Sequence, residues 1–206
     1  ETAGSVQTCS KYGKRVRARY RRNEHLTDAR KGITGIWCPW KELAAKADLV
    51  VLNRGAHYKP NDVFARELHS TLQWVVETAK PKARLVFRSM PVVALCYGER
   101  ARSPPSNSSQ LAAALVSGSI PAEYHWNQFE AQNKIAKRIA KATGVDYFSV
   151  WEMTSKWPFA GKQADRQDPN GNTGDCMHYC LPGPIDAWTT ALAVALAGPG
   201  QRNSAQ

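Results

Sequence analysis

The sequence predicts a three-layer α/β/α domain built around a parallel sheet. Short apolar runs of strand length alternate along the chain with longer segments of helical periodicity, which is the order typical of βαβ units. The 206 residues are enough for one such domain, and the hydrophobic share of 43% is ordinary for a globular protein. In this class of sheet, functional side chains gather beyond the carboxyl ends of the strands.

The first βαβ unit is predicted over residues 47–89. Residues 47–53 form a short apolar run, rich in β-branched side chains, that ends at Asn53 and favours a buried strand. A helix over residues 61–79, capped by Asn61, follows, and residues 84–89 form the next strand. His69 on this helix is expected to be exposed or packed, without a chemical role. The apolar face of the helix is predicted to contain Val63, Phe64, Leu68, Leu72, Val75 and Val76.

The second half of the chain continues the alternation. Residues 96–120 are rich in Ser, Pro and Ala and are expected to form a surface insertion with a short helix over 110–116. Residues 126–142 form an amphipathic helix ended by Gly144, residues 145–150 a third strand, and a helix starting at Asp186 ends the domain. The inward face of the 126–142 helix is predicted to hold Phe129, Ile135, Ala136 and Ile139.

Composition divides the chain into three parts. Residues 1–36 are expected to be a basic, poorly ordered segment, residues 37–198 the folded domain, and residues 199–206 a disordered tail. The net charge of +11 is concentrated over residues 11–22, which contain no acidic residue. Such a run is either a solvated arm or a contact for a polyanion: a nucleic acid, an anionic membrane surface or an acidic polysaccharide. Because no nucleic-acid-binding motif accompanies it, we expect no nucleic-acid partner.

The chain starts at Glu1 without an initiator methionine or a signal peptide, and no run reaches the roughly 18 apolar residues of a membrane span. We therefore expect a fragment or a processed product, with any membrane anchor N-terminal to these residues.

Five cysteines occur, and none forms a C-x-x-C pair. Cys176, His178 and Cys180 alternate within one short stretch and rarely converge on one ion, so we expect no metal site. Disulfide bonds in an oxidising compartment are the better interpretation. The disulfide candidates are Cys38, Cys96, Cys176 and Cys180.

The stretch from Asp175 to Gly183 carries the strongest chemical signal. An acid followed three residues later by a histidine supplies a general base and the carboxylate that orients it, two members of a hydrolase triad. The alternative is structural: Asp175 as a turn cap and His178 as a packing residue.

The segment 175–188, read DCMHYCLPGPIDAW, resembles the DCxHWCLPGxxDxW signature of the trichome-birefringence-like proteins and the wider PC-esterase group. Three further segments agree with that family in order, at residues 49–58, 85–91 and 148–154, so the resemblance spans roughly residues 47–197. Tyr58 and Tyr179 stand where the plant proteins carry tryptophan.

This resemblance implies an SGNH-hydrolase-like fold and O-acyl transfer, usually of acetyl, to or from polysaccharide hydroxyls by a Ser-His-Asp mechanism. By position, His178 would be the general base and Asp175 its orienting carboxylate. Asn53 would donate to the oxyanion, a contribution of about 2.7–4 kcal/mol at comparable sites. His57 and Arg88 match recurrent family positions and are candidate site residues without an assigned role.

The family takes its nucleophile from a Gly-Asp-Ser motif, which is absent from this sequence. Ser5 follows a glycine but lacks the aspartate, so we expect the nucleophile to lie upstream and the chain to be the C-terminal portion of the enzyme. The expected function is that of an O-acetyltransferase or acyl-esterase of the secretory pathway, in the Golgi lumen. It would use an acetyl donor such as acetyl-CoA as co-substrate, a glycan acceptor and no bound cofactor. The alternative is a catalytically inactive, carbohydrate-binding relic of the same fold.

Overall fold

The computed structural model describes residues 6–11, 14–21, 26, 40–55, 60–92, 128–156, 161–162, 175–179 and 181–197. The strands are β1 (Val6–Lys11), β2 (Lys14–Arg19), β3 (Leu49–Asn53), β4 (Arg84–Arg88), β5 (Asp146–Phe148), β6 (Gly161–Lys162) and β7 (Asp175–Tyr179). The helices are α1 (Lys41–Lys46), α2 (Asn61–Thr78), α4 (Phe129–Thr143), α5 (Trp151–Ser155) and α6 (Pro184–Ala197).

The centre of the fold is a parallel sheet in the order β3-β4-β5. All three strands were predicted, although β5 is shorter than the expected 145–150. The expectation that the first strand is buried was wrong, because β3 is an edge strand of this sheet and leaves Leu49 40% and Val51 41% exposed. Asn53 pairs with Arg88, and Arg88 pairs with Phe148, so the three strands finish level with one another. Their common carboxyl edge is the place where the fold class puts a functional site.

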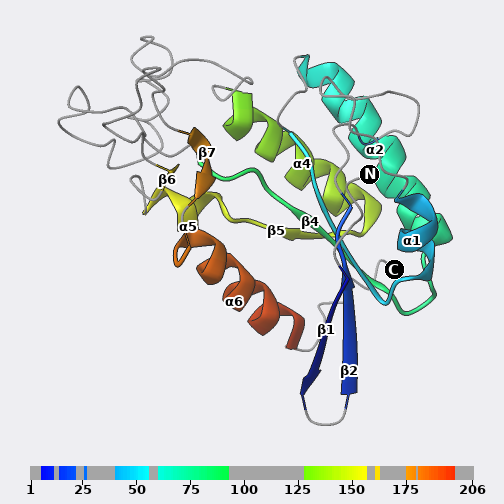
Figure 1. Ribbon diagram of the computed structural model, residues 1–206. Helices are drawn as coiled ribbons and strands as arrows, with labels where there is room; N and C mark the ends of the chain where they lie inside the picture. The colour runs from blue at the N-terminus through cyan, green and yellow to red at the C-terminus, as the bar shows by residue number, and fades with distance from the viewer. Residues whose placement is uncertain are drawn as a thin grey trace, which may run out of the picture.

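One face of the sheet carries the hydrophobic core. Helices α2 and α4 pack there side by side, and α1 lies beside α2, as Figure 1 shows. Phe87 of β4 is fully buried against both helices. The main cluster consists of Leu26, Phe64, Leu68, Leu72, Phe87, Ala136, Ile139, Ala140 and Val145.

Helix α6 covers the opposite face, which completes the predicted three-layer α/β/α arrangement (Figure 1). Arg84, at the start of β4, donates from Nη1 to the carbonyl of Leu196 at 2.8 Å and lies 3.4 Å from a carboxylate oxygen of Asp146. The outer side of α6 remains open to solvent, with Val194 68% exposed.

The predicted helices are largely confirmed, with corrections at particular residues. Asn61 is the first residue of α2 rather than its cap, which is Pro60, and its amide donates to Gln128 Oε1 at 2.9 Å. Val76, predicted on the inward face of α2, is 44% exposed because that face ends at Val75. His69 is exposed, as expected. Gly144 ends α4 in the left-handed conformation with φ of 73°, as its C-cap role requires.

The basic N-terminal segment differs from expectation. Instead of an irregular arm, β1 and β2 form an antiparallel hairpin that extends away from the parallel sheet (Figure 1). The hairpin register pairs Cys9 with Val16. An alternation of basic and apolar residues within β2, from Arg15 to Arg19, is typical of a strand.

Several predictions fall outside the described residues. These are the helix over 110–116, the tail over 199–206, and the positions of Ser5, Cys38, His57, Cys96 and Cys180. Among the described helices, none combines the length and the apolar character that crossing a bilayer requires.

Candidate functional site

Asn53 closes β3 at the carboxyl edge of the sheet and is tied to the end of β4. Its Nδ2 donates to the carbonyl of Arg88 at 2.8 Å and to the carbonyl of Ser89 at 3.2 Å. An amide nitrogen carries two hydrogens, so both have backbone acceptors in this geometry. The predicted oxyanion role stays a prediction, and it would require Asn53 to release one of these carbonyls.

Ser89 lies next to Asn53 but is not placed as a nucleophile. Its side chain is fully buried, and its Oγ accepts a hydrogen bond from the backbone nitrogen of Val150 at 2.9 Å. This contact joins the loop after β4 to the loop after β5, so Ser89 fixes the edge of the site.

Asn133 of α4 holds the next residue of that loop. Its Oδ1 accepts from the backbone nitrogen of Met90 at 2.8 Å, and its Nδ2 donates to the carbonyl of Met90 at 3.0 Å. The side chain thereby satisfies both backbone groups of a buried residue that has left the sheet. Gly55, across the edge, packs so tightly on Met90 that an added Cβ would lie 2.5 Å from Met90 Cγ.

Arg88 ends β4 with a guanidinium that is largely withdrawn from solvent. Its Cζ lies 5.2 Å from the centre of the Trp188 ring of α6. Its Nη1 is buried and has no hydrogen-bond partner among the described residues. Burial lowers the pKa of Arg88 to about 10, against a raising effect of Tyr179 and Tyr20, so the side chain remains cationic at neutral pH.

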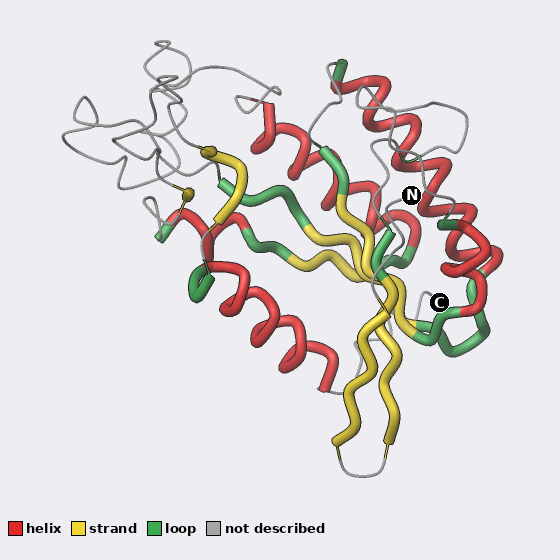
Figure 2. Tube along the Cα trace, in the orientation of Figure 1, coloured by secondary structure: helices red, strands yellow, loops and turns green. Residues whose placement is uncertain are grey.

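The Asp-x-x-His motif lies on strand β7, beyond the ends of β4 and β5, as Figure 2 shows. Residues 175–179 form a strand paired with β6. Gly161 pairs with Tyr179 and Lys162 with Asp175, so the ladder is shifted across Cys176, Met177 and His178.

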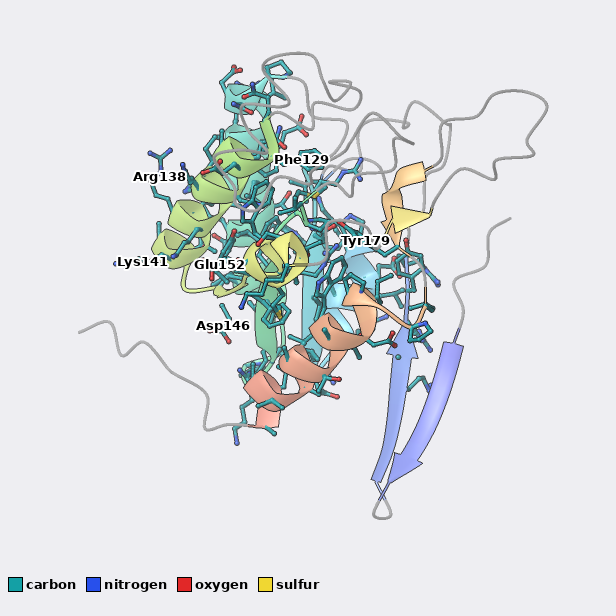
Figure 3. All side chains as sticks on the ribbon, turned by 90° about the vertical axis from the view of Figure 1, so that its left-hand side faces the viewer. Phe129, Arg138, Lys141, Asp146, Glu152 and Tyr179 are labelled. Carbon is teal, nitrogen blue, oxygen red and sulfur yellow. The ribbon has the colours of Figure 1, made fainter. Side chains whose placement is uncertain are left out.

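Tyr179, directly after His178, connects β7 with the rest of the site. Its hydroxyl donates to the carbonyl of Val92, and its ring meets Trp188 edge-on at 5.4 Å between ring centres. Burial raises the pKa of Tyr179, partly offset by the nearby Arg88 cation. Figure 3 shows Tyr179 near the start of α6, whereas Asp146 lies near the other end of that helix.

The C-terminal part of the motif begins α6. Pro184 is the first residue of the helix, a position that suits proline because the first amides have no intrahelical acceptor. Asp186, predicted as the start, lies in the first turn, where its Oδ2 accepts from the backbone nitrogen of Gly183 at 2.7 Å. This short contact fixes the chain between β7 and α6.

The structure therefore brings Asn53, Arg88 and the backbone of Asp175–Tyr179 to one edge of the sheet. Sequence reasoning did not assign site roles to Tyr179, Trp188 or Asn133. Tyr179 and Trp188 are aromatic positions of the 175–188 motif and could have been selected from it. Asn133 lies in no motif, so the sequence around it does not identify it. No group of three potential metal ligands occurs among the residues whose placement is described.

Comparison with known proteins agrees with this arrangement. The family model PC-Esterase, described as the GDSL/SGNH-like acyl-esterase family found in Pmr5 and Cas1p, matches residues 34–195. A search of curated proteins finds no match. The matched range contains the parallel sheet, strand β7 and almost all of α6.

Proposed function

The chain belongs to the PC-esterase family, and on that premise we propose that it performs O-acyl transfer with His178 as general base and Asp175 as the carboxylate that orients it. Family membership indicates an acyl-esterase or acyltransferase. The observation that carries the specific proposal is the position of the Asp-x-x-His strand beyond the carboxyl ends of β4 and β5 (Figure 2).

The proposed chemistry has two steps. A serine hydroxyl attacks the acyl carbonyl of the donor while His178 accepts the hydroxyl proton, and the donor's leaving group departs with that proton. The acceptor hydroxyl then attacks the acyl-serine, giving its proton to His178, which returns it to the serine oxygen. Water as acceptor gives hydrolysis, and a sugar hydroxyl gives transfer.

The nucleophile is assigned to a serine outside the described residues. Ser89, which lies at the correct edge, is fully buried, and its hydroxyl oxygen accepts a hydrogen bond from the backbone nitrogen of Val150. The absence of a Gly-Asp-Ser triplet from the sequence supports the same assignment.

The resemblance to the trichome-birefringence-like proteins supports a polysaccharide hydroxyl as the acceptor and an acetyl donor, such as acetyl-CoA, as co-substrate. The same resemblance supports a reaction in the lumen of the secretory pathway. The cysteine-rich motif is compatible with that oxidising compartment.

The test is acyl transfer by the full-length protein carrying His178→Ala, with His69→Ala as the matched control. Because His69 is exposed on α2, its replacement leaves turnover unchanged. Loss of the base lowers the rate of labelled acetate release or transfer by at least about a hundredfold. Wild-type turnover in His178→Ala would refute the proposal.

A serine-reactive probe tests the rival interpretation, a carbohydrate-binding relic. Covalent labelling of the full-length protein that decreases in His178→Ala supports the enzyme. Binding of polysaccharide with no labelling and no turnover would support the relic.

A further inference from the structure

Strand β7 is not part of the parallel sheet. It pairs with β6, a strand of two residues, and the two form a separate sheet. Within the part of the chain that the structure describes, no backbone ladder joins β7 to β4, and side chains supply the contacts between the motif strand and the sheet. Tyr179 supplies such a contact through its hydroxyl, which donates to the carbonyl of Val92.

A chain of three side chains leads from the sheet to that tyrosine. The guanidinium of Arg88 lies over the Trp188 ring at 5.2 Å, and the Trp188 ring meets Tyr179 edge-on at 5.4 Å with an interplanar angle of 77°. Arg88 belongs to β4, Trp188 to α6 and Tyr179 to β7. The three therefore join the sheet, the last helix and the motif strand at one point.

The chemistry of this cluster requires arginine. A planar guanidinium stacks on an indole ring, whereas a lysine ammonium is a compact charge that is more strongly hydrated. Among the described residues no carboxylate forms an ion pair with Arg88, and the charged side chain is placed against aromatic groups instead. Burying the Arg88 cation costs free energy, which suggests that the contacts made by this side chain have a role.

We propose that Arg88 is a positioning residue, which acts through Trp188 and Tyr179 to hold the backbone of His178 in register with the carboxyl edge of the sheet. The inference rests on the proposed function of His178. A displacement of about 1 Å at a reacting group can cost on the order of a hundredfold in rate, so the cluster has kinetic consequences.

Arg84 provides a matched control. It is on the same strand, is also an arginine and also contacts α6, but through the carbonyl of Leu196 at the far end of the helix. Replacement of Arg84 loosens α6 without touching Trp188 or Tyr179. A merely structural role of Arg88 would give the same results at both positions.

The experiment compares Arg88→Lys, Arg88→Met and Arg84→Lys in the full-length protein. We expect kcat to decrease by about tenfold to a hundredfold in both Arg88 variants, with KM within about twofold, and to remain near the wild-type value in Arg84→Lys. The midpoint of thermal unfolding is measured for all three variants. If Arg88 acts by positioning, the order of their kcat values should differ from the order of their unfolding midpoints.

A second readout does not depend on activity. NMR signals of the His178 imidazole, assigned among the five histidines of the chain, should shift in the Arg88 variants and not in Arg84→Lys. Equal effects of Arg84 and Arg88 replacement, or unchanged His178 signals in the Arg88 variants, would overturn the inference. Retained turnover in His178→Ala would instead remove the proposed function and leave the NMR result to decide the positioning role.

Tyr179→Phe keeps the inference testable if the Arg88 variants do not fold. It preserves the ring contact with Trp188 and removes the hydrogen bond to Val92. We expect it to lower kcat and to shift the His178 signals, and wild-type behaviour in both measurements would count against the proposal.

Discussion

Replacement of Asn133 by alanine should destabilise the protein more than the same replacement at Asn53 or Asn61, the other asparagines whose hydrogen bonds are described above. The Asn133 side chain is 8% exposed, and it bonds both the backbone nitrogen and the carbonyl of Met90, at 2.8 and 3.0 Å. Met90 is itself buried. Alanine leaves two buried backbone groups without their partner.

The size of the effect follows from those two groups. Each unsatisfied buried polar group costs about 1–3 kcal/mol, so the free energy of unfolding should decrease by about 2–6 kcal/mol. With a urea slope of about 2 kcal/mol/M, the unfolding midpoint falls by roughly 1–3 M. This is a large part of the roughly 5–15 kcal/mol that holds a typical domain folded.

Urea unfolding followed by circular dichroism measures the change, with Asn61→Ala as the control. Asn61 makes a partly buried hydrogen bond to another side chain, Gln128, and orphans no backbone group, so its replacement should cost at most about 1 kcal/mol. A midpoint shift in Asn133→Ala no larger than that in Asn61→Ala would refute the reasoning.

Two further predictions concern the same edge of the sheet. Gly55→Ala forces Met90 to move, because the new Cβ would lie 2.5 Å from Met90 Cγ, and it should lower the free energy of unfolding by about 1–3 kcal/mol. In urea unfolding, this decrease should be smaller when Met90→Ala is already present. Additive decreases in the double variant would contradict the contact. Burial raises the pKa of Tyr147 to about 12, above the unfolded value of about 10, so its contribution to stability is complete below pH 10 and is lost as the pH rises through 12. Tyr147→Phe should therefore show a smaller loss of stability between pH 9 and 12 than the wild type, and identical slopes would contradict the assignment.

Much of the fold was predictable because local pattern and tertiary structure agree. The run from Leu49 to Asn53 is β3, and the helical spacing of Phe64, Leu68 and Leu72 marks the buried face of α2. In α2 the pattern is enforced by burial, because Phe64, Leu68 and Leu72 belong to the main hydrophobic cluster. Val76 was assigned wrongly because spacing alone does not show where the neighbouring layer ends.

The N-terminal hairpin was missed for a different reason. Charge dominated the interpretation of residues 11–22, although the alternation of Arg15, Val16, Arg17, Ala18 and Arg19 has the period of a strand. A run of positive charge and a strand are compatible when the hairpin extends away from the sheet (Figure 1).

The candidate site was predictable in its identity but not in its geometry. The motif identified Asp175 and His178, and the ends of β3 and β4 identified Asn53 and Arg88. The cross-strand contact of Asn53 with Arg88 depends on register, and the clamp of Asn133 on Met90 joins positions 43 residues apart. Sequence spacing carries no information about either contact.

The two faces of the sheet are attached by different means, and this difference has a consequence for how the molecule opens. The layer of α2 and α4 buries large apolar side chains, whereas α6 is fastened at its ends, by Arg84 and Arg88, and leaves Val194 in water. Segments with few buried apolar contacts open locally at a lower free energy than the whole domain. Amide hydrogens of α6 should therefore exchange with solvent before those of α2. Strand β7, which contacts α6 through Tyr179 and Trp188, then belongs to the part of the fold that opens locally at the lower free energy.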